Sequence, residues 1–395
     1  MDATNTVQPA RRPLVRGYFY NNPDHYPPIV NAIRLLCRSG FDIELYCRDN
    51  GERLGNIYPP EAKIIWIDNR GRGSWMQFLA FIWQAVSKSR SDVGLFWGHD
   101  MHGFVAARLA AWRCRRPLVY HCHDYADPGW MTAGIHVVHA FERRYARTSD
   151  ATVIPDGRRG EMMKRVLKLP SEPIVAANAP LMTPLSTRGA LREALLVRGI
   201  KFEKIVFRQG RIGRGHGIEV TLRSMPWWQS KNWGFVVMGI GETEYSAHLA
   251  QLAQQLGLGD RFVILPPVKY DEILHFTPGA DLGHALYERI HVNNTHIGTA
   301  SNKVMEYLAA GIPLLVSPNE TLKDLIQRWQ CGACADETDP GSIAEAVNAI
   351  LTSSKVDKIK MAARTAFEAE FCYDRQFQPV IARMRALAVN SSGSR

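Results

Sequence analysis

A lysine and a glutamate stand three residues apart near the start of a predicted helix. Asn302 comes directly before Lys303, Glu306 follows, and the segment turns at Gly311-Ile-Pro into the apolar run LLVS. The N-terminus of a helix offers free backbone N–H groups and a partial positive charge, which suit a phosphate group. Lys303 adds a full charge, and Glu306 on the same helix face can accept hydrogen bonds from both ribose hydroxyls. The pattern therefore favours a nucleotide site, although a surface helix with a lysine–glutamate pair fits it too.

A glycine-rich loop lies between a predicted strand and a predicted helix, with the sequence QGRIGRGHGIE over residues 209–219. Its glycines, Gly210 among them, let the backbone approach an anion closely. Arg211, Arg214 and His216 could neutralise a departing diphosphate. A plain turn between two elements is the alternative interpretation of the same letters.

Two histidine-rich segments follow predicted strands in the first half of the chain. Residues 98–102 read GHDMH and residues 121–124 read HCHD. Open α/β sheets place their sites at the carboxyl ends of parallel strands, so these segments are candidates for a functional site. Histidine and aspartate are also zinc ligands, which leaves a metal site as one interpretation.

Two other motifs are incomplete. Cys331-Gly-Ala-Cys334 has the spacing of a redox or metal half-site, but no second such pair completes it, so we expect structural cysteines. Gly239-Ile-Gly241 follows a predicted strand, but Glu244 stands where a dinucleotide-binding fingerprint requires its third glycine.

The elements that must position these residues alternate between strand and helix, which predicts parallel sheets covered by helices on both faces. At 395 residues the chain is long enough for two domains, and we expect them at residues 1–190 and 200–373. The polar, proline-containing stretch 178–204 is the expected connection. A last helix, 374–390, is expected to pack back on the first domain. Expected strands are 14–20, 42–47, 62–67, 93–97, 117–121, 152–154, 205–209, 234–239, 261–265, 280–286 and 313–317. Expected helices are 28–39, 75–87, 104–112, 134–148, 217–224, 243–256, 303–310, 320–329 and 340–352.

Composition limits the compartment and the partners. The seven scattered cysteines are an odd number, which favours a reducing, cytoplasmic setting over a secreted disulfide scaffold. No apolar run has signal-peptide or membrane-spanning length. The longest such segment, Trp75–Val86, precedes Lys88 and Arg90 and fits either an interfacial helix or a buried one. The net charge of +10 suits a polyanion, an anionic membrane surface or a phosphate-bearing substrate.

The segment 301–317, SNKVMEYLAAGIPLLVS, resembles the donor-site signature of family 4 glycosyltransferases with the GT-B fold, in the subgroup that reads "nKxxEYmaaGkP". Three other segments resemble this family as well: DLGHALY at 281–287, LGLGDRFVILPPV at 256–268 and IGE at 240–242. The resemblance covers about 200–373 well and 90–180 more faintly.

The resemblance implies two Rossmann-like domains that face a cleft and a nucleotide-diphosphate sugar as donor, in the UDP or GDP form. Gly210 and Asn302 belong to the implied donor site, with Glu306 on the ribose and Lys303 on the diphosphate. Arg211, Arg214 or His216 would supply a further contact to the diphosphate.

The family retains anomeric configuration and stabilises the diphosphate with protein cations, without metal or cofactor. In keeping with this, the chain has no Asp-x-Asp triplet of the kind that holds a metal in GT-A enzymes. His123 matches the family's "hHD" position near the donor sugar and the acceptor, where a structural role is the alternative. Asp100 and Asp124 are secondary candidates for holding the acceptor hydroxyl.

The implied enzyme transfers a hexosyl or N-acetylhexosaminyl group to a glycan or lipid-linked acceptor. Its setting would be surface polysaccharide or glycoconjugate synthesis in the cytoplasm, with peripheral contact to an anionic inner membrane. Nucleic acid is not an expected partner, because no recognisable nucleic-acid-binding motif accompanies the positive charge.

Two positions depart from the family pattern. His216 stands where relatives carry Arg or Lys before the helix, and Gly298 replaces the first of two glutamates, eight residues before Glu306. These departures keep alternatives open: a catalytically inactive partner subunit, a sugar-nucleotide epimerase of the same fold, or a polyanion-binding protein.

Overall fold

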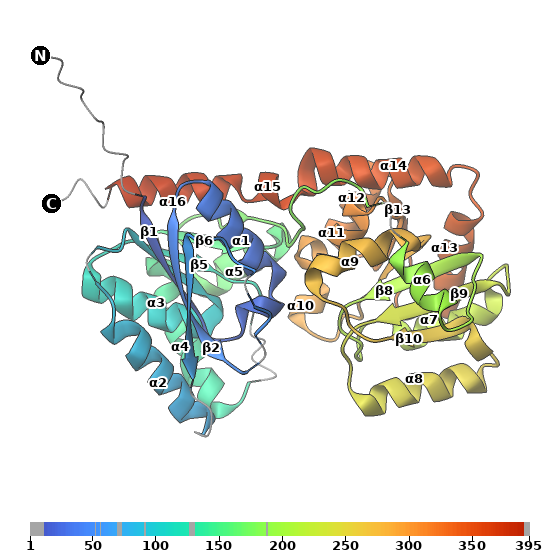
Figure 1. The fold of residues 1–395 in the computed structure, drawn as a ribbon, viewed down its shortest axis with the longest axis horizontal. Coiled ribbons are helices and arrows are strands. Elements are labelled where there is room, and N and C mark those ends of the chain that lie inside the picture. Colours follow the sequence, from blue (N-terminus) through green and yellow to red (C-terminus); the bar gives the residue numbers. More distant parts are fainter. Residues whose placement is uncertain are drawn as a thin grey trace, which may run out of the picture. The chain divides into compact units, whose positions relative to one another are not determined.

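The computed structural model describes residues 12–51, 53–55, 57–68, 73–90, 92–125, 131–186 and 189–390. These residues form two compact units (Figure 1). Unit 1 comprises the described residues up to Val153, residues 164–174 and the chain from Phe377, and unit 2 comprises 154–163 and 175–376. The chain therefore passes between the units at four places, and residues 175–190 belong to unit 2 although the sequence placed them in the first domain.

Unit 1 is built on a seven-stranded sheet with the order β3-β2-β1-β4-β5-β6-β7. The β1–β2, β1–β4, β2–β3, β4–β5 and β5–β6 pairs are parallel. Strand order reverses between β1 and β4, which makes the carboxyl ends of these two strands the switch point where such sheets bind ligands. The strands are β1 (Leu14–Phe19), β2 (Asp42–Asp49), β3 (Ala62–Asp68), β4 (Leu95–His99), β5 (Leu118–His121), β6 (Ala151–Ile154) and β7 (Ile174–Val175).

Helices cover both faces of this sheet, and Figure 1 shows α2, α3 and α4 together on one face and α1 on the other. The last helix, α16, belongs to the same unit, and its Arg383 and Arg385 donate hydrogen bonds to the carbonyls of Asp150 and Ser39. The helices are α1 (Pro27–Arg38), α2 (Ser74–Ser87), α3 (Asp100–Cys114), α4 (Ala133–Tyr145), α5 (Gly157–Leu167) and α16 (Gln378–Asn390). The first residues of α5 belong to unit 2.

Unit 2 repeats the architecture with a six-stranded parallel sheet in the order β10-β9-β8-β11-β12-β13. Its switch point lies between β8 and β11. The strands are β8 (Lys204–Gln209), β9 (Trp233–Met238), β10 (Phe262–Leu265), β11 (Leu282–Ala285), β12 (Leu314–Val316) and β13 (Gly332–Cys334). The helices are α6 (Ala190–Leu196), α7 (Ile218–Ser224), α8 (Thr243–Gln255), α9 (Tyr270–Phe276), α10 (Val292–Thr295), α11 (Asn302–Ala309), α12 (Glu320–Trp329), α13 (Pro340–Leu351), α14 (Val356–Ala366) and α15 (Tyr373–Gln376).

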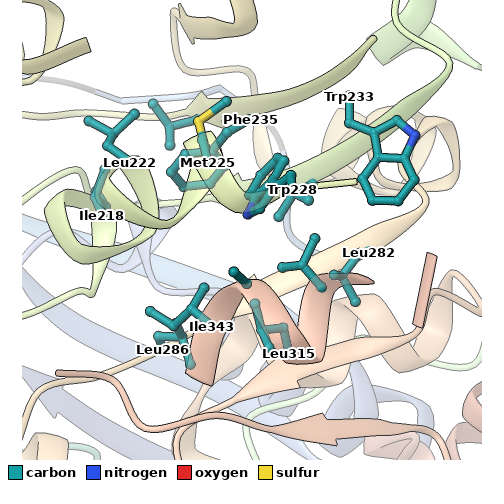
Figure 2. Close-up of a cluster of buried hydrophobic side chains, with 14 of the residues drawn as sticks. Ile218, Leu222, Met225, Trp228, Trp233, Phe235, Leu282, Leu286, Leu315 and Ile343 are labelled. Carbon is teal, nitrogen blue, oxygen red and sulfur yellow. The ribbon is translucent and has the colours of Figure 1, made fainter. Parts of the chain in front are cut away.

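The core of unit 2 lies between this sheet and the helices α7 and α13 (Figure 2). Leu222 of α7 and Ile343 of α13 are fully buried with Leu282 and Leu315 of the strands. The strands read as continuous apolar runs because both faces of a parallel sheet are covered. This packing fixes the strand ends from which the candidate site is built.

The prediction of an α/β chain with two Rossmann-like domains is confirmed. The predicted elements are present with shifts of one to a few residues at their ends. Several elements were not predicted: the helices α5, α6, α9, α10 and α14, and the strands β7 and β13. Of these, α6 lies inside the expected connection, and β13 lies in Cys331-Gly-Ala-Cys334. All seven cysteines are free thiols, and Cys331 is buried.

Candidate functional site

The carboxyl ends of β8 and β11 bring the glycine loop and Tyr287 to the switch point of unit 2, where α11 also begins. Lys303 in the first turn of α11 donates a hydrogen bond from Nζ to Tyr287 Oη (3.0 Å), with Nζ 5.1 Å from the ring centroid. Gly210 has a left-handed φ of +95°, and a Cβ at this position would lie 3.5 Å from Lys303 Cε. The structure thus holds the lysine beside the loop backbone, and the phosphate role predicted for both stays a prediction.

The start of α11 is fixed by Ser301, whose Oγ accepts a hydrogen bond from the backbone N–H of Val304 (3.4 Å). The same hydroxyl lies 2.7 Å from Tyr287 Oη. Burial would raise the pKa of Tyr287, but the positive charges of Lys303 and Arg208 outweigh it and lower that pKa. Two cations therefore lie around Tyr287 near the start of α11, an arrangement that favours an anion.

Glu306 lies one turn further along α11 and is only 4% exposed. Its Oε2 accepts a hydrogen bond from Gln209 Nε2 (2.5 Å), and Gln209 Oε1 accepts one from Thr277 Oγ1 (2.8 Å). Burial raises the pKa of Glu306, while Gln209 and Lys303 act in the opposite direction. A chain of hydrogen bonds from Thr277 through Gln209 therefore orients the Glu306 carboxylate at the end of β8.

Arg208 is part of this site although the sequence analysis did not single it out. It is 1% exposed on β8, with Nη1 3.2 Å from His284 Nδ1 and its guanidinium 5.6 Å from the Tyr287 ring centroid. Its Nε and Nη2 have no hydrogen-bond partner among the described atoms. The sequence does contain a signal for this residue, since Arg208 is a charged residue within the buried strand KIVFRQ.

The structure gives His216 a neutral ring. Burial, together with the positive charges of Arg208 and Lys303, lowers its pKa to about 2. Its Nδ1 lies 3.1 Å from the carbonyl oxygen of Arg211. His216 can therefore make a hydrogen bond to a phosphate but adds no charge to the site at neutral pH.

The two loop arginines differ in their surroundings. The side chain of Arg214 is 74% exposed, forms an ion pair with Glu219 (3.4 Å) and lies over the ring of Tyr245 (5.2 Å). Arg211 is exposed next to His216. Since Arg214 already has an acidic partner, Arg211 is the better candidate for a second charge on a diphosphate.

Gly298 has a φ of +36° and borders a buried carboxylate. A Cβ on this glycine would overlap Asp156 Oδ2 and lie 2.9 Å from Thr321 Cβ. Asp156 is fully buried, and Oδ2 accepts a hydrogen bond from the backbone N–H of Thr299 (3.1 Å), while Oδ1 accepts one from Arg159 N–H (3.0 Å). The space that a longer side chain at 298 would need is thus occupied by an aspartate from the start of α5.

In unit 1, the ends of β4 and β5 bring Asp100, His123 and Asp124 together. Asp100 has a φ of +48°, and its Oδ1 accepts hydrogen bonds from the backbone N–H groups of His123 (2.8 Å) and Asp124 (3.3 Å). Burial, with a smaller contribution from Asp124, raises the pKa of Asp100 to about 7. The structure brings these three candidate residues into one group, with a carboxyl that can exchange a proton near neutral pH.

His123 also belongs to a second group, with His99 and His121. His99 Nδ1 lies 3.1 Å from His123 Nε2, and the three side chains have ligand nitrogens within 4.8 Å of one another. Burial lowers the pKa values of His99 and His121 well below the usual range, so both rings are neutral. The zinc interpretation of the two histidine-rich segments rested on more histidines and aspartates than this group contains, since Asp100, His102 and Asp124 lie outside it.

Two family models match the chain in succession. The model described as "Glycosyl transferase 4-like domain" matches residues 29–177, and the model described as "Glycosyl transferases group 1" matches residues 198–366. In a comparison with the sequences of curated proteins, none matches.

Solved structures match the chain over nearly its whole length. HepE of Anabaena, crystallised with UDP and glucose, shares 15% identity with a TM-score of 0.75, over 94% of this chain and 99% of HepE. Sucrose-phosphate synthase of Thermosynechococcus elongatus shares 13% identity with a TM-score of 0.70, over 97% of this chain and all (100%) of the synthase. WaaG, a glycosyltransferase involved in lipopolysaccharide biosynthesis, shares 15% identity with a TM-score of 0.66, over 93% of this chain and 98% of WaaG. At this identity the likeness establishes the fold.

Proposed function

The chain belongs to the family 4 glycosyltransferases, and we propose that it transfers a hexosyl or N-acetylhexosaminyl group from a UDP- or GDP-sugar to a glycan or lipid-linked acceptor. The observation that carries the proposal is the position of Lys303 against Gly210 and Tyr287 at the switch point of unit 2. The UDP in the structure of HepE, which has the same fold, supports a uridine nucleotide.

The diphosphate is proposed to bind at the Gly210 loop and the first turn of α11. Lys303 is held by the phenol of Tyr287 beside the loop, where its charge can face an anion. Negative charge grows on the diphosphate as its bond to the sugar breaks, and a preorganised cation stabilises that change without a metal ion on the diphosphate. Glu306, with its orientation set by Gln209, would accept the ribose hydroxyls.

The acceptor is assigned to unit 1, with Asp100, His123 and Asp124 as the group that holds its hydroxyl. The acceptor oxygen forms the new bond to the anomeric carbon and loses its proton, while the bond from that carbon to the diphosphate oxygen breaks. A carboxyl with a pKa of about 7, as in Asp100, is suited to share this proton near neutral pH. We propose retention of anomeric configuration, as in the family.

The setting we propose is surface polysaccharide or glycoconjugate synthesis in the cytoplasm, at the inner face of an anionic membrane. Helix α2 presents four exposed apolar side chains: Trp75 (43% exposed), Met76 (59%), Leu79 (50%) and Trp83 (72%). Such a helix can lie in the headgroup region of a bilayer, and the net charge of +10 favours an anionic surface. Within the part of the chain that the structure describes, no helix is long and apolar enough to span a membrane.

The test is a thermal-shift screen of the purified protein against UDP, GDP, ADP and CMP and their sugars, with and without EDTA. A ligand at 100 times its Kd adds about 2.7 kcal/mol of stability, which gives a measurable shift. Lys303→Met and Glu306→Gln should each reduce the shift strongly. Lys358→Met removes an exposed lysine of α14 in the same unit and serves as the matched control, with an unchanged shift.

Each outcome has a separate meaning. If no nucleoside diphosphate stabilises the protein, the donor site is wrong. If binding occurs but no sugar reaches any acceptor, the protein acts as an inactive partner subunit, which the glycine at 298 and the neutral His216 would explain. Conversion of the donor to its epimer would instead identify an epimerase.

A further inference from the structure

Three histidines converge where β4 and β5 end in unit 1. His99 and His121 are the last residues of these neighbouring parallel strands and are paired in register. Both are fully buried, and His123, two residues further along, is 4% exposed. The strand register alone therefore brings two imidazoles side by side, and the third joins them through the turn after β5.

Their ring nitrogens have the spacing of a ligand set. His99 Nδ1 and His123 Nε2 are 3.1 Å apart, and one ligand nitrogen of each residue lies within 4.8 Å of the others. Two nitrogens bound tetrahedrally to the same zinc ion are about 3.3 Å apart, since each Zn–N bond is about 2.0–2.1 Å long. The His99–His123 pair is already close to this separation, and any longer separation, up to 4.8 Å, would have to shorten for all three nitrogens to bind one ion.

The environment of the rings also fits a metal. Neutral imidazole is the form that coordinates a metal ion, and His99 and His121 are both fully buried. Neither ring nitrogen of His121 has a hydrogen-bond partner among the described atoms, and the same holds for His99 Nε2.

The neighbours of the cluster do not satisfy these nitrogens. The ring centroid of Trp97 lies 4.1 Å from that of His99, and the ring centroid of Phe377 lies 6.2 Å from that of His121. A buried polar atom without a partner is costly, and an ion would supply the missing partner.

We propose that His99, His121 and His123 bind one divalent transition-metal ion, with zinc as the ion that this all-imidazole set favours. The ion would tie the ends of β4 and β5 together next to Asp100, which accepts hydrogen bonds from the turn after β5. Coordination through Nε2 would place the remaining proton of His123 on Nδ1, so that His123 would not act as a base. The proposed diphosphate site is on other residues, in unit 2, and does not depend on this ion.

The experiment measures bound metal directly. Protein without an affinity tag is grown with zinc, purified without chelator and analysed for metal content. The wild type and the control His102→Leu, in which a histidine of α3 outside the cluster is replaced, should each contain about one zinc per chain. His121→Leu keeps an apolar side chain against Phe377 and should lose the metal. Replacement by Co²⁺ should give a visible absorption that reports its coordination by the three imidazoles.

A second measurement covers the case in which His121→Leu does not fold. The wild type is stripped with a chelator and dialysed against zinc alone, and its melting temperature is recorded before and after. A rise that the chelator reverses, and that His99→Leu lacks, supports the site. The absence of zinc binding in the stripped wild type, or equal binding by His121→Leu, overturns the proposal. Neither result affects the nucleotide screen, whose variants lie in unit 2.

Discussion

Gly298→Ala tests whether Asp156 really occupies the space beside this position. The added Cβ would overlap Asp156 Oδ2, lie 2.8 Å from Asp156 Cγ and lie 2.9 Å from Thr321 Cβ. Asp156 is fully buried and cannot move towards water without giving up its hydrogen bonds to Thr299. The substitution must therefore either displace this carboxylate or shift the turn that carries Gly298.

The expected cost has two parts. A residue with a Cβ in the left-handed region, at φ +36°, costs about 1–2 kcal/mol relative to glycine. Displacement of Asp156 weakens hydrogen bonds to a buried charge, worth about 1.5–3 kcal/mol each. We therefore expect Gly298→Ala to lower the free energy of unfolding by about 3 kcal/mol or more.

Gly311→Ala is the matched control because it imposes the same backbone strain without the overlap. Gly311 has a φ of +65°, and its added Cβ would meet Lys360 O at 3.5 Å and Arg364 Cβ at 3.6 Å, which are ordinary contacts. This variant should cost only about 1–2 kcal/mol. Both values are measured from urea-induced unfolding followed by circular dichroism, with the slope of the transition compared to check that the unfolding reaction is the same.

A double variant isolates the contact with Asp156. In Gly298→Ala/Asp156→Ala the overlap is absent, so the two substitutions together should cost clearly less than the total of their separate effects. Gly298→Glu, which inserts the family's missing glutamate, should destabilise the protein at least as much as alanine and should not raise transferase activity. If Gly298→Ala lowers the free energy of unfolding no more than Gly311→Ala does, Asp156 does not obstruct a side chain at 298. Additive effects of Gly298→Ala and Asp156→Ala would refute the overlap as well.

Two further predictions concern unit 1. The pKa of Asp100 is raised from 3.8 to about 7, so its stabilising neutral form is complete below pH 4 and is lost as the pH rises through 7. Asp100→Asn keeps an oxygen that accepts a hydrogen bond from the backbone N–H of His123. Relative to wild type it should stabilise the protein by at most about 4 kcal/mol at pH 8 and hardly at pH 4. An equal difference in melting temperature between variant and wild type at both pH values would contradict this. Trp83→Glu on α2 should change stability by less than about 0.5 kcal/mol, since the side chain is 72% exposed, yet should abolish cosedimentation with phosphatidylglycerol vesicles. Val197→Glu, at an 89% exposed position of unit 2, should leave vesicle binding intact, and equal behaviour of the two variants would exclude α2 as the membrane surface.

The sequence predicted where the glycine loop and Lys303, both assigned to the proposed donor site, lie in the fold. The glycine loop after β8 and the start of α11 each follow from a short run of letters, and parallel strands bring their carboxyl ends to one edge. For this reason Gly210 and Lys303 meet as expected. The connection between domains was harder to predict, because the proline-containing stretch concealed the short helix α6 and because the chain passes between the units more than once.

The side-chain partners of these residues could not be predicted, since they come from distant parts of the chain. Tyr287 anchors Lys303 from the loop after β11, and Asp156 fills the space at Gly298 from a segment 142 residues earlier. A single sequence shows that a glutamate is absent at 298, but it does not show which group takes its volume. The neutral state of His216 likewise depends on burial and on the buried charge of Arg208, which no local motif indicates.

The charges around Tyr287 explain why this site should favour an anion more strongly than its one lysine suggests. Arg208 is fully buried behind the ring, and two of its donor nitrogens have no partner among the described atoms. Lys303 donates a hydrogen bond to the hydroxyl of the same tyrosine, so that Tyr287 contacts both cations. Two cations that share a neutral partner repel each other, and their burial costs desolvation free energy. A bound diphosphate would relieve that repulsion, so nucleotide binding and the stability of unit 2 should rise together.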